Sequence, residues 1–158
     1  MRMCTTAMAA ASLALGVVAS SPTYAEILLA KSRVAAYDVP TGLIPAPLDD
    51  AGRTFLTFNT SKKGVIVITF NAECAATGPV SGHIGLQILV DSKPTNPKAS
   101  LDELAFCTAS SGDTEIFTAA SRQSFVKVDE GPHIVEVLIS RVGAESGRID
   151  DSSIVIFD

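Results

Sequence analysis

The chain has 158 residues, of which 47% are hydrophobic and 18% are charged, and its formal net charge at pH 7 is −5. Acidic charge dispersed over the chain argues against binding to nucleic acid or to anionic membranes, because both attract basic patches. A single domain is the expectation for a chain of this length.

The start of the chain has the layout of a secretory signal peptide. Arg2 supplies a basic start, residues 7–18 form an uncharged run rich in Ala and Leu, and Thr23-Tyr24-Ala25 ends that run. The apolar run is shorter than the about 20 residues that a membrane span needs. We therefore expect a signal peptide over residues 1–25, a single β-sandwich domain over residues 26–158, and a secreted or periplasmic protein with no membrane span.

The first half of the predicted domain reads as strands between Gly and Pro turns. A strand is expected to begin at Ile27 and to run as far as Tyr37, and the prolines of residues 40–47 exclude helix and continuous strand. Residues 53–60 alternate, with Leu56 and Phe58 on one face. After a turn, residues 65–70 are apolar on both faces, which is typical of a central strand that is covered on both sides.

The second half continues the same pattern. Residues 83–90 place Ile84, Leu86, Ile88 and Val90 on one face. A loop follows at residues 91–97. Further short strands are predicted at residues 116–117, 125–128, 134–139 and 154–157, whereas residues 101–106 fit a strand or a single helical turn.

This spacing, with β-branched residues gathered in the runs, predicts an all-β fold. We expect a two-sheet antiparallel β-sandwich of about eight strands, with the topology of a jelly roll. The seven Phe residues lie in the apolar runs and are expected to form the core: Phe55, Phe58, Phe70, Phe106, Phe117, Phe125 and Phe157.

Several of these runs also resemble a known kind of protein. The order of Phe70-Asn71-Ala72-Glu73-Cys74, Ile88-Leu89-Val90-Asp91 and Leu104-Ala105-Phe106-Cys107, followed by residues 131–137 and 149–154, is similar to that of small uncharacterised secreted bacterial β-sandwich proteins. It is more distantly similar to jelly rolls of the C1q/TNF type. The resemblance implies the fold and self-association, and it implies no activity.

Cys74 and Cys107 are expected to form a disulfide, because an exported protein meets an oxidising compartment. A metal site at these cysteines lacks ligands at the usual spacing, and a catalytic thiol lacks a neighbouring base. The first cysteine of the chain, Cys4, is expected to leave with the signal peptide.

Few other residues are candidates for a catalytic or metal-binding role. No catalytic motif surrounds His83 or His133, and both are expected at strand starts without a chemical role. Calcium is the metal that the acidic pairs could bind, with Asp150 and Asp151 as the first candidate ligands, although no calcium-loop motif occurs. Solvated turns are the default interpretation of these acidic pairs.

The sequence therefore favours a secreted, non-enzymatic module that binds a protein or a glycan, or that assembles with copies of itself. No cofactor is expected. The alternative is a hydrolase or lyase on the same scaffold, which requires distant Asp, Glu and His side chains to converge at a pocket. Absence of Trp weakens a sugar-stacking face, although polar side chains can bind sugars by hydrogen bonds alone.

Overall fold

The computed structural model describes residues 25–98, 104–112 and 114–158. Within these residues no helix is assigned, and none therefore has the length and apolar character of a membrane span. Eight strands of four or more residues are present: β1 (Ile27–Arg33), β4 (Phe55–Thr60), β5 (Gly64–Thr77), β6 (His83–Val90), β8 (Ala105–Thr108), β9 (Thr118–Val128), β10 (Gly131–Val142) and β11 (Ser146–Phe157). Three strands have two residues each: β2 (Tyr37–Asp38), β3 (Ile44–Pro45) and β7 (Lys93–Pro94).

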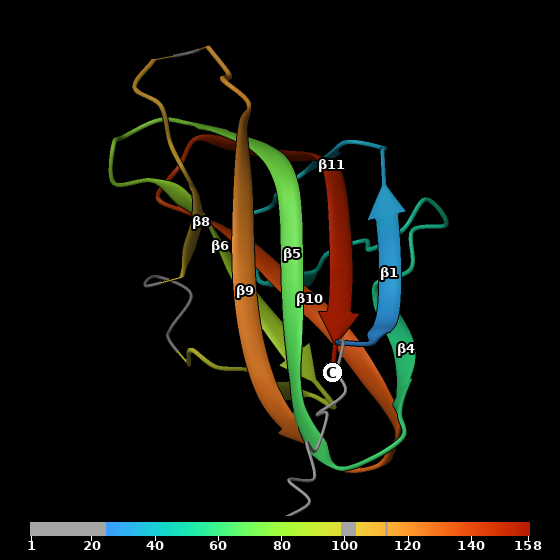
Figure 1. Ribbon diagram of the computed structural model, residues 1–158. Helices are drawn as coiled ribbons and strands as arrows, with labels where there is room; N and C mark the ends of the chain where they lie inside the picture. Colours follow the sequence, from blue (N-terminus) through green and yellow to red (C-terminus); the bar gives the residue numbers. More distant parts are fainter. Residues whose placement is uncertain (1–24, 99–103, 113) are drawn as a thin grey trace, which may run out of the picture.

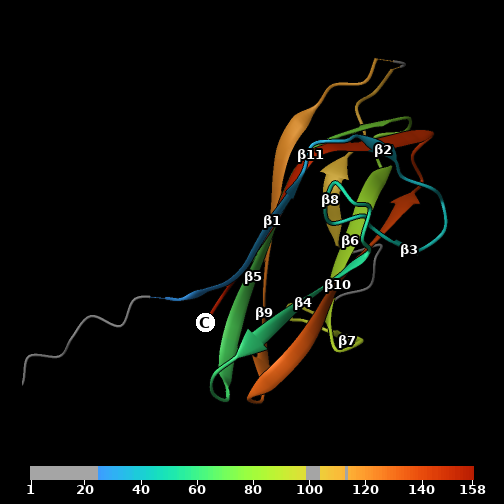
Figure 2. The same cartoon turned by 90° about the vertical axis from the view of Figure 1, so that its right-hand side faces the viewer.

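The strands form two layers, which Figures 1 and 2 show from the front and from the side. The first sheet has the order β1-β11-β5-β9, with β2 also paired to β11. In the second sheet, β10 lies between β6 on one side and β3 and β4 on the other, and β7 and β8 pair with the far side of β6. The named strands pair antiparallel throughout the described residues.

The topology is that of a jelly roll. Counting the eight longer strands along the chain gives the orders 1-8-3-6 and 2-7-4-5 in the two sheets. Such an arrangement results when a long antiparallel hairpin folds over, so that successive strands alternate between the sheets except at its turn, where β6 and β8 pair in the same sheet. The predicted all-β sandwich with about eight strands is confirmed.

The core lies between the sheets and follows from period-two alternation. In β4 the burial pattern places Leu56, Phe58 and Thr60 inside, as predicted. In β6 the four predicted aliphatic residues are all buried. The largest fully buried side chains come from both sheets and from the loop before β4, and include Phe70, Leu48, Ile66, Ile68, Ile84, Leu86, Ile88, Ile139, Ile149, Ile154 and Ile156.

Some expected positions are corrected. Residues 65–70 do lie in a central strand, but only one of its faces is covered: Ile66, Ile68 and Phe70 are buried, whereas Val65 is 55% exposed. The sheet has a partner layer on its inner side alone, so the apolar outer residues are available to solvent. Residues 116–117 precede β9 and are not in a strand.

The Phe residues divide between core and surface. Phe58 and Phe70 are buried as expected, but Phe55, Phe117 and Phe125 are exposed, so their assignment to the core is wrong. The misplacement has a physical cause in β9. Phe125 shares its face with Lys127, two residues further on, and the solvated lysine marks that face as the outer one.

A disulfide joins the two sheets. Cys74 of β5 and Cys107 of β8 are bonded, with Cα atoms 6.2 Å apart, which confirms the predicted pairing. The bond ties the end of β5 in the first sheet to the β6 side of the second sheet. Residues 1–24 lie outside the described residues, so the signal peptide stays a prediction, and so does the conformation of residues 101–103.

Candidate functional site

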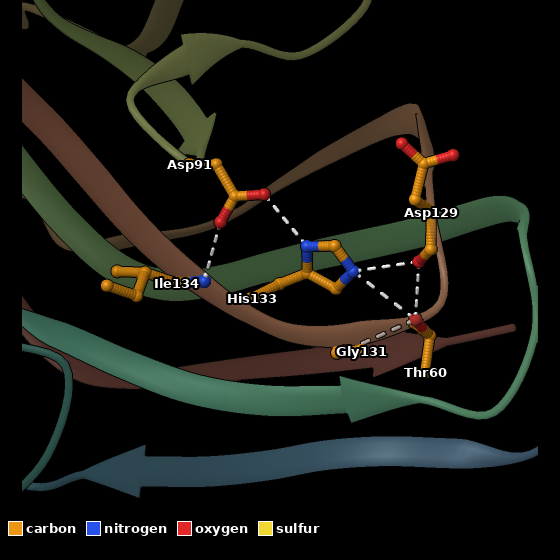
Figure 3. Close-up of polar contacts among 6 residues, drawn as sticks. All are labelled: Thr60, Asp91, Asp129, Gly131, His133 and Ile134. Carbon is orange, nitrogen blue, oxygen red and sulfur yellow. Dashed lines mark hydrogen bonds and ion pairs between the residues drawn. The ribbon is translucent and has the colours of Figure 1, made fainter.

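One of the two histidines lies in a buried polar cluster (Figure 3). His133 is on the core-facing side of β10 and is 8% exposed. Its Nδ1 lies 2.8 Å from Asp91 Oδ2, in the turn after β6, and its Nε2 lies 2.9 Å from the carbonyl oxygen of Asp129, in the hairpin between β9 and β10. Four chain segments meet there, because Thr60 at the end of β4 completes the cluster.

Hydrogen bonding in the cluster defines the charge of the ring. A carbonyl oxygen and a carboxylate can only accept, so these partners favour a ring that carries a proton on both nitrogens. Burial lowers the pKa of His133, but the hydrogen bonds to Asp91 and to the Asp129 carbonyl, together with both carboxylate charges, raise it above its ordinary value. In its protonated form, His133 connects the turn after β6 with the β9–β10 hairpin.

Asp91 is fixed from a second direction. The backbone N–H of Ile134 donates to Asp91 Oδ1 over 3.0 Å. Burial raises the pKa of Asp91, but this hydrogen bond and those with His133 outweigh burial and hold the pKa below its usual range. The backbone of Asp91 is left-handed, with φ 51°, so the turn itself is held in a less common conformation.

The same cluster superficially matches the alternative prediction of an enzyme, because a hydroxyl, an imidazole and a carboxylate lie next to one another in space. Thr60 Oγ1 is 3.3 Å from His133 Nε2. However, the hydroxyl donates to the Asp129 carbonyl over 2.7 Å, and Thr60 is only 3% exposed. A ring that already donates from Nε2 cannot accept the hydroxyl proton, so the geometry favours a structural clamp over a nucleophile and base.

The space beside this cluster is also small. The hollow that His133 lines with Asp91 and Asp129 has a volume of 110 Å³. Small-molecule sites usually have about 300–1,000 Å³. His83, the other histidine, is buried at the start of β6, with Nδ1 3.3 Å from the carbonyl oxygen of Ser81.

The calcium candidates lie in a β-bulge and not in a loop. Asp150 pairs with Glu73 of β5, and the next paired residue of β11 is Ser153, so the strand carries one extra residue. Asp151 takes that position, with φ 36°. Within the described residues no group of three or more His, Cys, Asp or Glu side chains is placed to hold a metal ion, and calcium binding stays a prediction.

The outer face of the first sheet has a more ordered arrangement. Strand register aligns one residue from each of β1, β11, β5 and β9 in successive rows across the sheet. At one end, the apolar row consists of Ile27, Phe157, Val67 and Phe125. The next row is mixed and consists of Ala30, Val155, Thr69 and Gln123.

Uncharged polar side chains form the third row, which we call the serine–asparagine row: Ser32, Ser153, Asn71 and Ser121. Its two outer members are exposed and its two central members are half-buried. Asn71 Nδ2 lies 3.5 Å from Ser153 Oγ. Beyond the serine–asparagine row, the β-bulge adds acidic side chains. The outer face of the sheet therefore changes from apolar through neutral polar to acidic along the strands.

Two hollows lie along this row. The edge hollow, of 590 Å³, is lined by Ser32 and Ser153 of the row, with other residues of β1 and β11 and the loop 49–51. The bulge hollow, of 300 Å³, is lined by Asn71 and Ser121 of the row, with Glu73, Ala119 and Asp151 among its other residues. Both volumes are within the range of about 300–1,000 Å³ that small-molecule sites occupy.

The loop bordering the edge hollow is held by its own charges. Asp49 is buried and accepts hydrogen bonds from Arg53 Nε over 2.6 Å and from the backbone N–H groups of Ala51 and Arg53 over 3.1 Å. The Arg53 side chain is the largest influence that lowers the pKa of Asp49. Asp50 accepts from the Val34 N–H over 2.9 Å, which attaches the loop to the end of β1.

Sequence reasoning missed this face because each row takes one residue from each of four strands. Alternation within β5 does place Val67, Thr69 and Asn71 on one side. Which residues of β1, β11 and β9 stand beside them depends on register, which a single sequence does not give.

Comparisons with known proteins add little to these observations. No family model and no curated protein matches the chain. Among solved structures, it is similar to a family 35 carbohydrate-binding module from Clostridium thermocellum, with 13% identity over 77% of this chain and 98% of that chain and a TM-score of 0.33. A second family 35 module, from Cellvibrio japonicus, shows 13% identity over 83% of this chain and 86% of that chain, also with a TM-score of 0.33. A similarity at this TM-score supports no conclusion about the fold or the function of this chain.

Proposed function

We propose that this chain is an exported, non-enzymatic module that binds a glycan on the outer face of the β1-β11-β5-β9 sheet. The observation that carries the proposal is the serine–asparagine row, whose four members line two hollows of ligand size. Cleavage after Ala25 and release into the periplasm or the medium belong to the same proposal.

The chemistry of the row matches that of a sugar. A Ser hydroxyl donates and accepts, and an Asn amide does both through separate atoms, so each can pair with a sugar hydroxyl whichever way that hydroxyl points. The row carries no charge although the whole chain has a net charge of −5. A neutral, hydroxyl-rich ligand loses little solvation energy on such a surface, whereas a charged ligand would need a partner of opposite sign.

The apolar row supplies the second element of a sugar site. Phe125 is 51% exposed, and its ring can cover the C–H face of a pyranose. Burial of apolar surface contributes about 25 cal/mol per Å². One row, that of Gln123, lies between Phe125 and Ser121 along β9, so Phe125 is reached by a part of the glycan that extends about 13 Å along the strand from the serine–asparagine row.

A second copy of the chain is the competing occupant of this face. Ile27, Val65 and Phe125 expose apolar area on the first sheet, and self-association through a sheet face would bury it. We favour the glycan because members of the serine–asparagine row line both hollows, whereas a dimer core is usually apolar.

A glycan array tests the proposal with a matched pair of variants. Phe125→Ala alters the first sheet, and Phe55→Ala alters the second sheet at a Phe with nearly the same exposure, 52% against 51%. Binding of a neutral glycan is expected for the native protein and for Phe55→Ala, and reduced binding is expected for Phe125→Ala. Light scattering after size exclusion would show a dimer that Phe125→Ala dissociates if the second copy is the true occupant, and an empty array would refute glycan binding.

A further inference from the structure

We infer that the two hollows hold one linear oligosaccharide of about four sugar units, laid across the strands along the serine–asparagine row. This inference rests on the proposed glycan function. It adds the length of the ligand and its direction on the sheet.

The register fixes the direction. Ser32 pairs with Ser153, Ser153 with Asn71, and Asn71 with Ser121, so the row runs perpendicular to the strands from one edge of the sheet to the other. Neighbouring strands lie about 4.8 Å apart. That spacing is comparable with the length of one pyranose ring, so an extended chain of sugars across the sheet presents about one sugar to each row member.

Neighbouring side chains line the two hollows at the centre of the row. Ser153 lines the edge hollow and Asn71 lines the bulge hollow, and Asn71 Nδ2 lies 3.5 Å from Ser153 Oγ. A ligand that occupies one hollow therefore reaches the boundary of the other. A disaccharide can fill either hollow by itself, but only a longer chain can contact Ser32 and Ser121 at the same time.

The two ends of the row differ. The row begins on β1 and ends on β9, which are the outermost strands of the sheet order, and both end residues are exposed. The loop 49–51 borders the β1 end, where Lys31, Asp49 and Asp50 also line the edge hollow. The charged residues of the bulge hollow, Glu73 and Asp151, stand beside the row, so additional sugars can extend past its β9 end.

Isothermal titration with cello-, xylo-, manno- and chitooligosaccharides of one to six units tests the inference on the exported protein. Affinity should rise by at least about tenfold between the disaccharide and the tetrasaccharide, because the longer chain gains the hydrogen bonds of the second hollow. It should change little from four units to six.

Two variants at opposite ends of the row complete the test. Ser32→Ala and Ser121→Ala should each weaken tetrasaccharide binding by about twofold to tenfold. Thr57→Ala, at an exposed position of β4 in the second sheet, should leave it unchanged. Full affinity for a monosaccharide or disaccharide, or a response to only one of the two variants, would overturn the four-sugar inference while the proposed function stands. Failure of every glycan to bind would overturn both.

Discussion

The cluster around His133 and the serine–asparagine row are both assembled from four chain segments, but they use their polar groups in opposite ways. In the cluster, the imidazolium, the Asp91 carboxylate and the Thr60 hydroxyl are hydrogen-bonded to one another or to backbone, close to the buried core. In the row, the end residues face solvent on the outer side of a sheet. Polar groups whose partners lie within the protein stabilise it, whereas groups directed to solvent are available to a ligand.

The difference assigns separate roles to the two regions of one sandwich. Changes in the cluster should alter the free energy of unfolding, and changes in the row should alter binding alone. The predictions below separate these effects, beginning with the covalent connection between the sheets.

The largest effect is expected from loss of the disulfide. The double variant Cys74→Ser/Cys107→Ser removes a bond that spans 33 residues of sequence, and loop-closure entropy predicts a loss of about 3–4 kcal/mol in the free energy of unfolding. Urea denaturation of native and variant protein measures it. If the bond restricts the unfolded chain, the His133 cluster and the serine–asparagine row should lose stability together. An unchanged unfolding midpoint would show that the bond does not restrict the unfolded chain.

Removal of the His133 side chain is the next largest change. His133→Ala leaves the Asp91 carboxylate and the Asp129 carbonyl without the ring that bonds them, and the expected loss is about 1.5–3 kcal/mol because one of these bonds joins charged groups. The matched change in the row, Ser121→Ala, should shift the free energy of unfolding by less than about 0.5 kcal/mol. Comparable losses in both variants would remove the distinction between the two regions.

Stability should depend on pH through the same cluster. The folded-state pKa of His133 is raised, so its contribution is complete below the ordinary value of about 6.5 and is lost as pH rises through the folded pKa. Asp91 and Asp129 have lowered pKa values, so their contributions are present above about pH 4 and are lost as pH falls through the folded values. Stability should therefore be greatest between these limits.

Thermal melts over pH measure this dependence, with His133→Gln as the control. The decline on the alkaline side should disappear in that variant, which lacks the titrating ring, whereas the decline on the acidic side should persist. Other charges near the cluster are Lys63, Lys93 and Lys127. A decline on the alkaline side that His133→Gln retains would assign it to another group.

The smallest change in stability is expected on the outer face of β5. Val67→Thr retains the β-branched shape at a half-buried position of the apolar row and should alter the unfolding midpoint only slightly. Ile68→Thr, one residue further and fully buried, places a hydroxyl in the core and should cost about 1–3 kcal/mol. Equal losses would show that both faces of β5 are covered.

Much of the fold could be predicted because its signals are local. Alternation in residues 53–60 and 83–90 identifies the buried faces of β4 and β6, and Gly and Pro mark the turns. Hydrophobicity alone assigns Phe125 to the core, whereas Lys127 on the same face of β9 marks that face as exposed. Strand lengths were underestimated for β9 and β11, since Ser, Thr and Asp within them resemble loop residues until a neighbouring strand supplies their hydrogen bonds.

The sequence by itself determined a layered β fold with its bridging cysteines, because side-chain period and turn chemistry act over a few residues. Only the tertiary structure decided which residues stand beside one another across the strands. His133 and Asp91 are 42 residues apart along the chain, and Asn71 and Ser153 are separated by 82. Such neighbours are set by strand register and sheet order, which depend on the packing of the whole core.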